Sequence, residues 1–416
     1  MADVSQQSLR VPMAIDRIVV LPFLALLAFA LPWSSEFAGG FGAVFSHLFN
    51  VALMGLILDW VFRSRRRWHA MPRAYAAMVV FVLAHNFITW VVIHPGELSW
   101  QPIVVDLGVK TSIRDSSASL LVKNLLFMLL PFALATQIRG AREIRAMTWA
   151  LGASLLALVT LGDAGGVLAG GERFSGGMSN PNAFAEVTVI LAWLALASLM
   201  DRSRTPAVSV AAAIALVFAF VLLLMSGSRG AIVAVAAGLG VFALSSLRVV
   251  RPRYVVMAVV IGAGVLLATP RGVFDQLFQR SQTVSGDNVR LFIWADYLRH
   301  WREFAWTGVG LGREMSVIDA AIRGGRIWNP HNTYLGALVA FGIVGLAVVA
   351  NVLVDLARRL LAECRRSRSE GAPGIMVGLV VSLAVLFFFG DRLESRVTWM
   401  MLGIVGAHLE NRGGAA

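Results

Sequence analysis

Long apolar runs alternate with short polar segments along the whole chain. A helix needs about 20 apolar residues to cross the roughly 30 Å hydrocarbon core of a bilayer, and runs of about this length recur. The first run has no convincing small-residue cleavage site, so we interpret it as a retained span and not as a signal peptide. The pattern predicts an all-α integral membrane protein of about twelve transmembrane helices, at residues 17–34, 41–62, 74–93, 117–137, 147–163, 183–200, 207–226, 231–246, 254–269, 333–356, 375–390 and 397–409.

Composition supports this interpretation, because 58% of the residues are hydrophobic and only 14% are charged. The formal net charge of +12 is carried almost entirely by arginines in short loops, which is not the pattern of a nucleic-acid-binding surface. The single cysteine, Cys364, excludes a disulfide framework within the chain and a cysteine-based metal site.

The arginines also predict the orientation of the chain, because cytoplasmic loops of membrane proteins are enriched in basic residues. One set of alternate loops holds most of them: Arg63, Arg65, Arg66, Arg67, Arg73, Arg139, Arg142, Arg145, Arg202, Arg204, Arg248, Arg251, Arg253, Arg358, Arg359, Arg365, Arg366 and Arg368. We expect these loops and both termini to be cytoplasmic. The chain then divides into three parts. Residues 1–269 contain nine spans, residues 270–332 form a periplasmic loop with amphipathic helices, and residues 333–416 contain three spans and a cytoplasmic C-terminus.

Five polar segments fall on the opposite, periplasmic side. The first, Arg173–Asn182, combines one guanidinium with glycine and proline turns, which suits either an anion cradle or an ordinary polar turn. The second, Ser226–Ala231, is so short that Arg229 must lie at the membrane boundary. An arginine there either snorkels to the interface or meets an anion.

The third segment is the long loop, in which Asp287–Trp306 has the spacing of an amphipathic helix. Arg290 lies near the start of this helix, where anions are favoured, although a solvated surface charge fits as well. The following Gly308–Gly312 run has no strand before it, so we interpret it as a turn and not as a phosphate loop.

The fourth segment, Asn329–Tyr334, places His331 at the mouth of the tenth span, where an imidazole can accept a proton from a hydroxyl. A lone histidine is more often structural. The fifth, Asp391–Arg396, carries acids that either orient a histidine, bind sugar hydroxyls or pair with their own arginines.

The chain lacks any Asp-x-Asp pair, any His or Cys cluster with metal-ligand spacing, and the Gly-x-Ser-x-Gly motif of serine hydrolases. After these exclusions, the chemical groups left on the periplasmic side are several guanidiniums, one imidazole and a few carboxylates, all beside lipid. These groups suit a lipid that carries a diphosphate, because arginines bind its charge and stabilise it as a leaving group.

These segments together resemble the O-antigen ligase and polymerase superfamily, over roughly residues 165–400. The resemblance is carried by Ser226–Ala231, Arg290-Leu-Phe-Ile-Trp294, Gly308–Gly312 and His331-Asn-Thr-Tyr-Leu335, followed by Gly342 and Gly345. It implies a multi-pass protein of the bacterial inner membrane, a glycosyltransferase of the GT-C class that inverts the anomeric centre. It implies no cofactor and no metal, an undecaprenyl-diphosphate-linked O-antigen as donor, and lipid A-core as acceptor.

The resemblance also implies roles for single residues. His331 would be the catalytic base that deprotonates the acceptor hydroxyl, and Arg229, Arg290 and Arg173 would bind the donor diphosphate. Supporting roles would fall to Asp391, Asn332, Tyr334, Ser228 and Asn182.

Other functions stay open at this point. An O-antigen polymerase, or a ligase that glycosylates protein, would use the same donor with another acceptor. A transporter or flippase for a lipid-linked sugar would place charged residues along a path through the membrane. Lys123 in the fourth span is the main feature of that kind. The clustering of polar groups at one face favours an enzyme.

Overall fold

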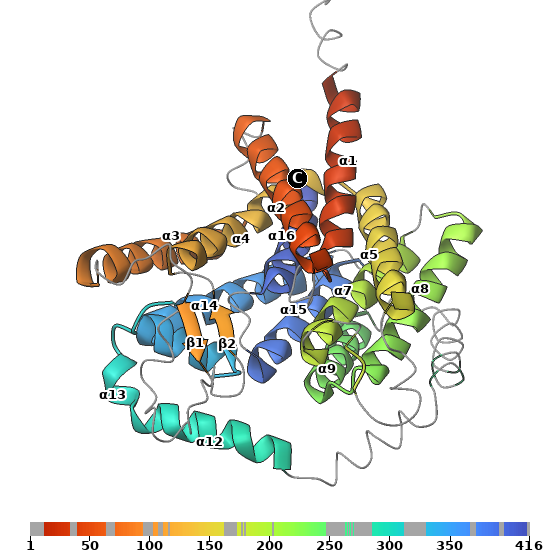
Figure 1. The fold of residues 1–416 in the computed structure, drawn as a ribbon. Helices are drawn as coiled ribbons and strands as arrows, with labels where there is room; N and C mark the ends of the chain where they lie inside the picture. The colour runs from red at the N-terminus through yellow and green to blue at the C-terminus, as the bar shows by residue number, and fades with distance from the viewer. Residues whose placement is uncertain are drawn as a thin grey trace, which may run out of the picture.

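A computed structural model shows a helical protein (Figure 1). It describes residues 12–33, 40–63, 71–94, 103–106, 111–114, 117–161, 173–175, 178, 180–201, 204–246, 263, 265, 267, 269, 285–311, 330–366, 372–390 and 395–413. The main helices are α1 (Pro12–Ala30), α2 (Gly40–Arg63), α3 (Arg73–Phe87), α4 (Ser117–Gln137), α5 (Ala141–Leu161), α7 (Pro181–Met200), α8 (Pro206–Met225), α9 (Arg229–Ser246), α12 (Ser285–Arg299), α14 (Thr333–Arg366), α15 (Ala372–Phe389) and α16 (Arg396–Gly413). A π-helix, η1 (Ile88–Ile93), extends α3, and the short α13 (Trp301–Phe304) follows α12.

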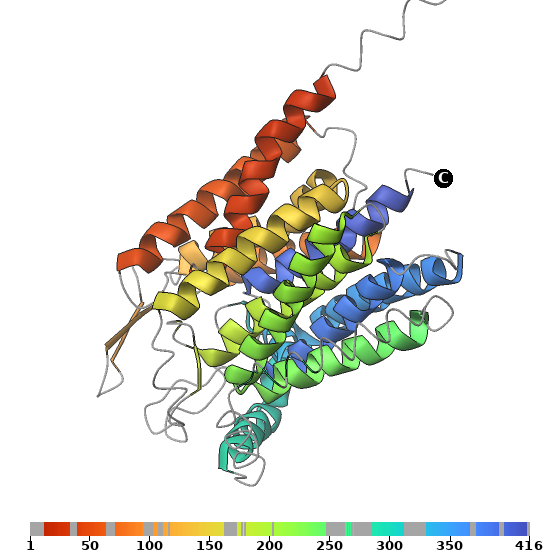
Figure 2. The same cartoon turned by 90° about the vertical axis from the view of Figure 1, so that its right-hand side faces the viewer.

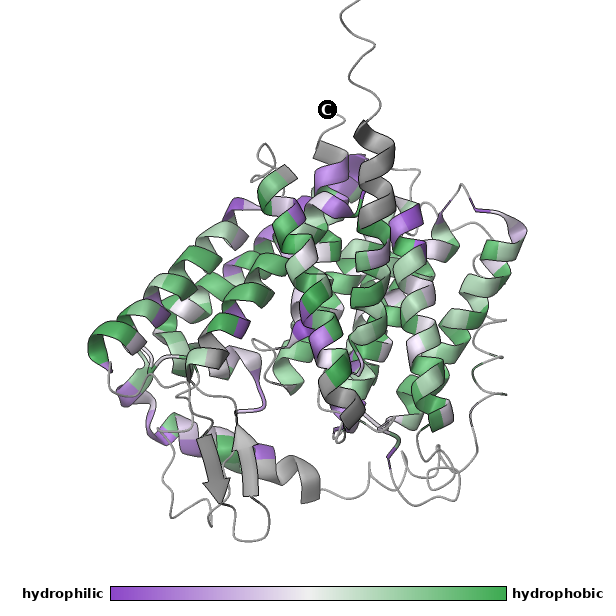
Figure 3. Ribbon diagram, turned by 45° about the horizontal axis from the view of Figure 1, so that its top comes forward, coloured by the Kyte–Doolittle hydropathy of each residue, from purple (hydrophilic) through white to green (hydrophobic). Residues whose placement is uncertain are grey.

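Among the described residues, seven helices are long and apolar enough to cross a membrane: Val44–Phe62, Arg73–Ile93, Ala141–Leu161, Pro181–Met200, Pro206–Met225, Thr333–Arg366 and Ala372–Phe389. Each coincides with a predicted span. The chain is therefore a multi-pass membrane protein, and Figure 3 shows that apolar residues dominate the bundle helices.

Five predicted spans are not among these seven helices. Shorter apolar helices at Val20–Ala30, Val122–Gln137 and Arg229–Ser245 occupy three of them. The predicted span 397–409 lies in α16, and most of 254–269 lies outside the described residues. The total of twelve therefore stays a prediction.

The bundle has two distinct ends. Figures 1 and 2 show α12 at one end, which we call the α12 end, and the C-terminus of the chain at the other. Helices α7, α9, α14 and α16 begin at the α12 end, and α8 and α15 finish there. The loops that join these helices at the α12 end contain most of the predicted site residues.

Helices α9 and α15 form the most extensive helix contact among the described elements. Glycine makes it possible, because a Cβ atom added at Gly378 of α15 would lie 2.3 Å from the ring of Trp193 of α7. One added at Gly238 of α9 would lie 2.7 Å from the same ring. The three helices therefore pack closely around one indole, which fixes their relative heights.

A short β-hairpin is the exception to the all-α prediction. Strands β1 (Ile103–Asp106) and β2 (Thr111–Arg114) pair antiparallel, with Ile103 opposite Arg114. The hairpin lies at the α12 end of the bundle (Figure 2). The hydropathy pattern did not predict it, because four-residue strands lie far below the length of a membrane span.

Helix α12 is shorter than the predicted stretch, which is interrupted at His300 before α13 begins. Its buried face includes Ile293 and Tyr297, which pack with Phe304 and with Val339 of α14 in a small core of their own. Large apolar side chains buried in this way contribute about 1.5–3 kcal/mol each. This separate core fastens α12 to the first turns of α14.

Candidate functional site

All five predicted polar segments contribute described residues, and those of the first four converge on the C-terminal turns of α15. In the fifth segment, Arg396 instead donates a hydrogen bond to the hydroxyl of Ser46 in α2 at 3.3 Å. We call residues Ala384–Gly390 the α15 terminus. The contacts below bring the starts of α7, α9 and α14, together with α12, around this point. Asp391 of the fifth segment lies outside the described residues, although Gly390 immediately before it is described.

Arg173 joins the first two segments. Its Nε donates a hydrogen bond to the carbonyl oxygen of Ser226 at 2.8 Å, and its Nη2 donates to Oδ1 of Asn182 at 2.7 Å. The next residue, Phe174, donates its backbone N–H to the carbonyl of Met225 at 3.1 Å. The planar guanidinium therefore ties the start of α7 to the end of α8.

The turn that follows α8 presents Arg229 as the first residue of α9. Gly227 has φ of 58°, a left-handed conformation that glycine adopts without strain. Ser226 accepts the N–H of Ser228 through its hydroxyl at 3.2 Å, and the carbonyl of Ser228 accepts from Ile232 at 3.0 Å. Ser228 is therefore the residue that caps α9, and the tight turn leaves the Arg229 side chain exposed.

The start of α9 lies directly against the α15 terminus. A Cβ atom added at Gly230 would lie 2.7 Å from the Cβ and Cγ atoms of Phe389. Only glycine permits this approach, so the Ser-Gly-Ser-Arg-Gly spacing has a steric reason. Arg229 is consequently held beside the last turn of α15.

The turn that contains His331 also contacts the α15 terminus. Thr333 donates its hydroxyl to the carbonyl of Gly390 at 2.6 Å. Tyr334 donates its hydroxyl to the carbonyl of Ala384 at 2.9 Å, and its ring packs against Phe387. These contacts place the start of α14 on the same helix end that Arg229 adjoins.

His331 itself has a left-handed backbone, with φ of 49°, and is the only non-glycine residue with positive φ among the described residues. Asn332, which follows, caps α14 by accepting the N–H groups of Tyr334 and Leu335 at 3.0 Å each. The left-handed conformation is typical of strained positions, and such positions cluster at functional sites. Asn332 therefore has a capping role that fixes the backbone on the C-terminal side of His331.

Arg290 approaches through α12. Trp294, one turn later on the same face, donates its indole N–H to the carbonyl of Pro330 at 2.7 Å. Its ring also packs edge-on against Phe388 at 5.4 Å. Because residues four apart share a helix face, Arg290 lies on the side of α12 that faces the His331 turn.

A second set of contacts holds the turn after α13 against α14. Helix α14 is broken at Gly342, which has φ of 69°, and the preceding carbonyls of Val339 and Ala340 accept hydrogen bonds from the N–H groups of Val309 and Gly310, both at 2.9 Å. A Cβ atom at Gly308 would lie 2.3 Å from the Ala340 oxygen. The glycine run is thus a turn, as predicted, and its glycines permit backbone packing against a broken helix.

Helix α3 and η1 bind the same turn, which the sequence did not indicate. His85 lies 2.5 Å from the carbonyl of Thr307 through Nε2, and Trp90 donates its indole N–H to the carbonyl of Leu311 at 3.1 Å. Asn86 accepts the N–H of Leu311 at 3.4 Å. These residues lie more than 200 positions away in the sequence, and only their polarity within an apolar span could have signalled them.

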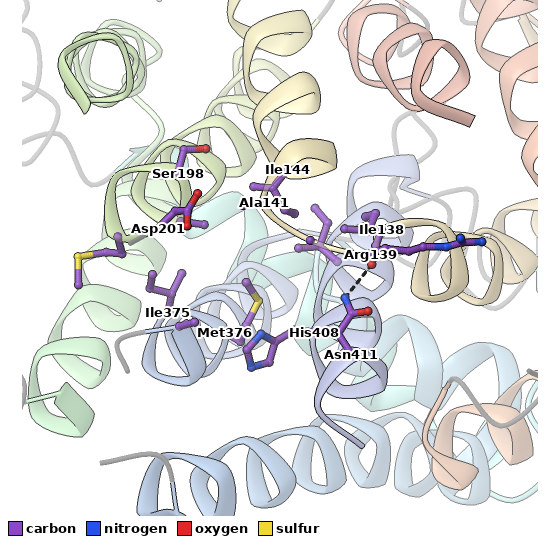
Figure 4. A pocket seen from close by; sticks show the side chains of 15 residues that line it. Ile138, Arg139, Ala141, Ile144, Ser198, Asp201, Ile375, Met376, His408 and Asn411 are labelled. Atoms are coloured by element: carbon purple, nitrogen blue, oxygen red, sulfur yellow. Dashed lines mark hydrogen bonds between the residues drawn. The ribbon is translucent and has the colours of Figure 1, made fainter. Parts of the chain in front are cut away.

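A cavity of about 290 Å³ lies at the opposite end of the bundle, and none of the predicted site residues lines it. Two of its polar side chains have hydrogen-bond partners: Asn411 donates to the carbonyl of Ile138 at 2.8 Å, and Asp201 accepts from Arg145, outside the lining, at 2.7 Å. Figure 4 shows Arg139 extending away from His408. Within the described part of the chain, no three His, Cys, Asp or Glu side chains are grouped to hold a metal ion.

Comparisons with known proteins match the part of the chain that contains these turns. A family described as O-antigen ligase matches residues 214–350, which contain the Arg229 turn, α12 and the His331 turn. A protein named O-antigen ligase from Pseudomonas aeruginosa is 29% identical over 299 residues, which cover 67% of this chain and 71% of that relative. The chain is therefore similar to the O-antigen ligase family over the region that contains these turns.

Proposed function

We propose that this protein is an O-antigen ligase that transfers a glycan from undecaprenyl diphosphate to lipid A-core, completing lipopolysaccharide. The observation that carries the proposal is the convergence of Arg229, the Arg290 face of α12 and the His331 turn on the α15 terminus. These are the groups that a diphosphate donor and a hydroxyl acceptor need. The similarity to the O-antigen ligase family supports the same assignment.

The arginines bind the donor in this proposal. Arg229, at the start of α9, and Arg290, on α12, approach the α15 terminus from two elements, so their guanidiniums can bind opposite sides of a diphosphate. Bidentate contacts from arginine hold this charge and stabilise the additional charge of the leaving group. Arg173 supports them by binding the Ser226 carbonyl in the turn before Arg229 through Nε, and by binding Asn182 of α7 through Nη2.

His331 is the base. The acceptor hydroxyl oxygen attacks the anomeric carbon of the donor sugar, and its proton passes to the imidazole. The bond between that carbon and the diphosphate oxygen breaks, and its electron pair leaves with undecaprenyl diphosphate. Attack opposite the leaving group inverts the anomeric centre. The diphosphate needs no separate acid, because the arginines stabilise its charge.

The setting of the site follows from the charge distribution. The α12 end of the bundle lies opposite the arginine-rich loops, so we place it on the periplasmic side of the bacterial inner membrane. Both termini are then cytoplasmic, and the fold is a GT-C-type bundle of about twelve spans with a periplasmic loop at 270–332. Asp391 and Ser228 complete the polar surroundings of the donor in this arrangement.

In vitro transfer tests the proposal. Purified protein in lipid is incubated with an undecaprenyl-diphosphate glycan, lipid A-core and EDTA, and wild type is compared with His331→Ala. Joined lipopolysaccharide from the wild type alone is the expected result, with the variant at least about 100-fold slower.

Other outcomes would contradict the proposal in distinct ways. Chains that lengthen on the carrier would identify a polymerase. Movement of the lipid-linked glycan across a vesicle membrane, without transfer to any acceptor, would identify a transporter.

A further inference from the structure

Glu186 is a carboxylate buried inside the bundle, with 2% of its surface exposed. It lies in α7, one of the helices apolar and long enough to span a membrane. Burying an acid among apolar helices is costly, and acids within spans face the protein interior and serve a function. Neither the hydropathy pattern nor the family motifs pointed to this residue.

The face of α7 that carries Glu186 is fixed by its neighbours. Asn182, one turn earlier on the same face, accepts the hydrogen bond from Arg173 at 2.7 Å. Trp193, two turns later on that face, donates its indole N–H to the hydroxyl of Ser382 of α15 at 3.1 Å and packs against Gly238 of α9. Glu186 therefore faces α9 and α15.

The height of Glu186 follows from the same contacts. Ser382 also donates to the carbonyl of Ala234 at 2.8 Å, so Trp193, Ser382 and Ala234 lie at one level. Helices α7 and α9 both begin at the α12 end. Glu186 lies two helical turns, about 10 Å, from Trp193 toward that end. The turn before Arg229 lies the same distance from Ala234 in the same direction, so Glu186 and that turn are at one height.

Positive charge accumulates at this level. The N-terminus of α9 carries about half a unit of positive charge, and Arg229 adds a full charge at its first residue, where a cation is unfavourable. Arg173 binds the adjoining Ser226 carbonyl. Glu186 is a buried acid at the same height as this positive charge.

We propose that Glu186 is the resident counter-charge of the donor site, which limits the affinity of the arginines for diphosphate so that the spent carrier can leave. The inference rests on the proposed function. In general, at an effective dielectric constant of about 20, a unit charge on the order of 10 Å from a singly charged ligand changes the affinity for that ligand roughly tenfold. Neutralising Glu186 should therefore tighten diphosphate binding, whereas a purely structural residue would weaken it when replaced.

Titration calorimetry with inorganic pyrophosphate tests whether replacing Glu186 tightens or weakens diphosphate binding. Glu186→Gln is expected to bind pyrophosphate roughly tenfold more tightly than the wild type at low salt, and its transfer reaction should be inhibited at correspondingly lower pyrophosphate concentration. Glu186→Asp keeps the charge and should bind within about threefold of the wild type. Glu186→Met, which is similar in volume and neutral, replaces the glutamine variant if that variant does not fold.

Glu143 provides the matched control. It is also a buried acid, 6% exposed, but it lies in the first turn of α5 at the opposite end of the bundle. Glu143→Gln should leave pyrophosphate affinity unchanged. Equal or weaker binding by Glu186→Gln would overturn the inference, as would an equal gain in Glu143→Gln.

The two proposals fail separately. If wild type transfers no glycan to lipid A-core, the proposed function fails whatever the calorimetry gives. If wild type transfers glycan and Glu186→Gln binds pyrophosphate no more tightly, only the counter-charge role fails.

Discussion

The left-handed backbone of His331 predicts a conflict between stability and activity at one residue. With φ of 49°, a side chain at this position crowds its own backbone. A pair of variants separates the backbone from the imidazole. His331→Ala and His331→Gly both lack the ring, and they differ only in the Cβ atom that causes the crowding.

The expected difference can be worked from the conformation. A left-handed residue with a Cβ atom costs about 1–2 kcal/mol, which glycine avoids. Glycine also makes the unfolded chain more flexible, which offsets about 0.4–1 kcal/mol of this gain. His331→Gly should therefore be about 0.5–1 kcal/mol more stable than His331→Ala, or about 1–3 °C higher in thermal midpoint. Both variants should lose transfer by about 100-fold or more.

Tryptophan fluorescence during heating in detergent, together with the lipopolysaccharide transfer assay, measures both quantities on one preparation. A glycine variant no more stable than the alanine variant would show that the backbone is not strained at this position. Transfer near the wild-type rate in either variant would show that the imidazole is not the base.

Three further substitutions test the packing around the site. Gly342→Ala, at φ of 69° with its added Cβ 2.2 Å from a backbone oxygen, should lower the thermal midpoint sharply, whereas Gly240→Ala, with open space around it, should not. Trp90→Phe removes the donor to the buried Leu311 carbonyl and should destabilise by about 1–3 kcal/mol in a denaturant titration, and no change would mean that this contact is dispensable. Asp296→Asn should raise the thermal midpoint, because both oxygens of this buried carboxylate lack hydrogen-bond partners among the described residues, and a lower midpoint would reveal a favourable contact.

Hydropathy alone predicted much of the fold. Seven predicted spans coincide with long apolar helices, because a bilayer demands a continuous apolar run of fixed length. No comparable length requirement applies to the hairpin formed by Ile103–Asp106 and Thr111–Arg114, or to the break in α14 at Gly342, so hydropathy did not predict them. Nothing in a local pattern distinguishes the broken α14 from a straight helix, since its break is stabilised by the distant Gly308 turn.

The site was partly predictable for the same reason. Arg229 and His331 stood out because polar residues at the mouth of an apolar span are costly. The contacts of His85, Asn86 and Trp90 with the Gly308 turn join segments more than 200 residues apart, and one sequence does not reveal such pairs. That Arg173 binds the donor stays a prediction, and its contacts show that it also orders the neighbouring turn.

The most direct test of the central claim is an experimental structure of the wild-type protein with a lipid-linked diphosphate glycan bound. The diphosphate should lie between Arg229 and Arg290 beside the α15 terminus, with the anomeric carbon accessible from the His331 side. A diphosphate bound elsewhere, or one that these arginines do not contact, would contradict the account.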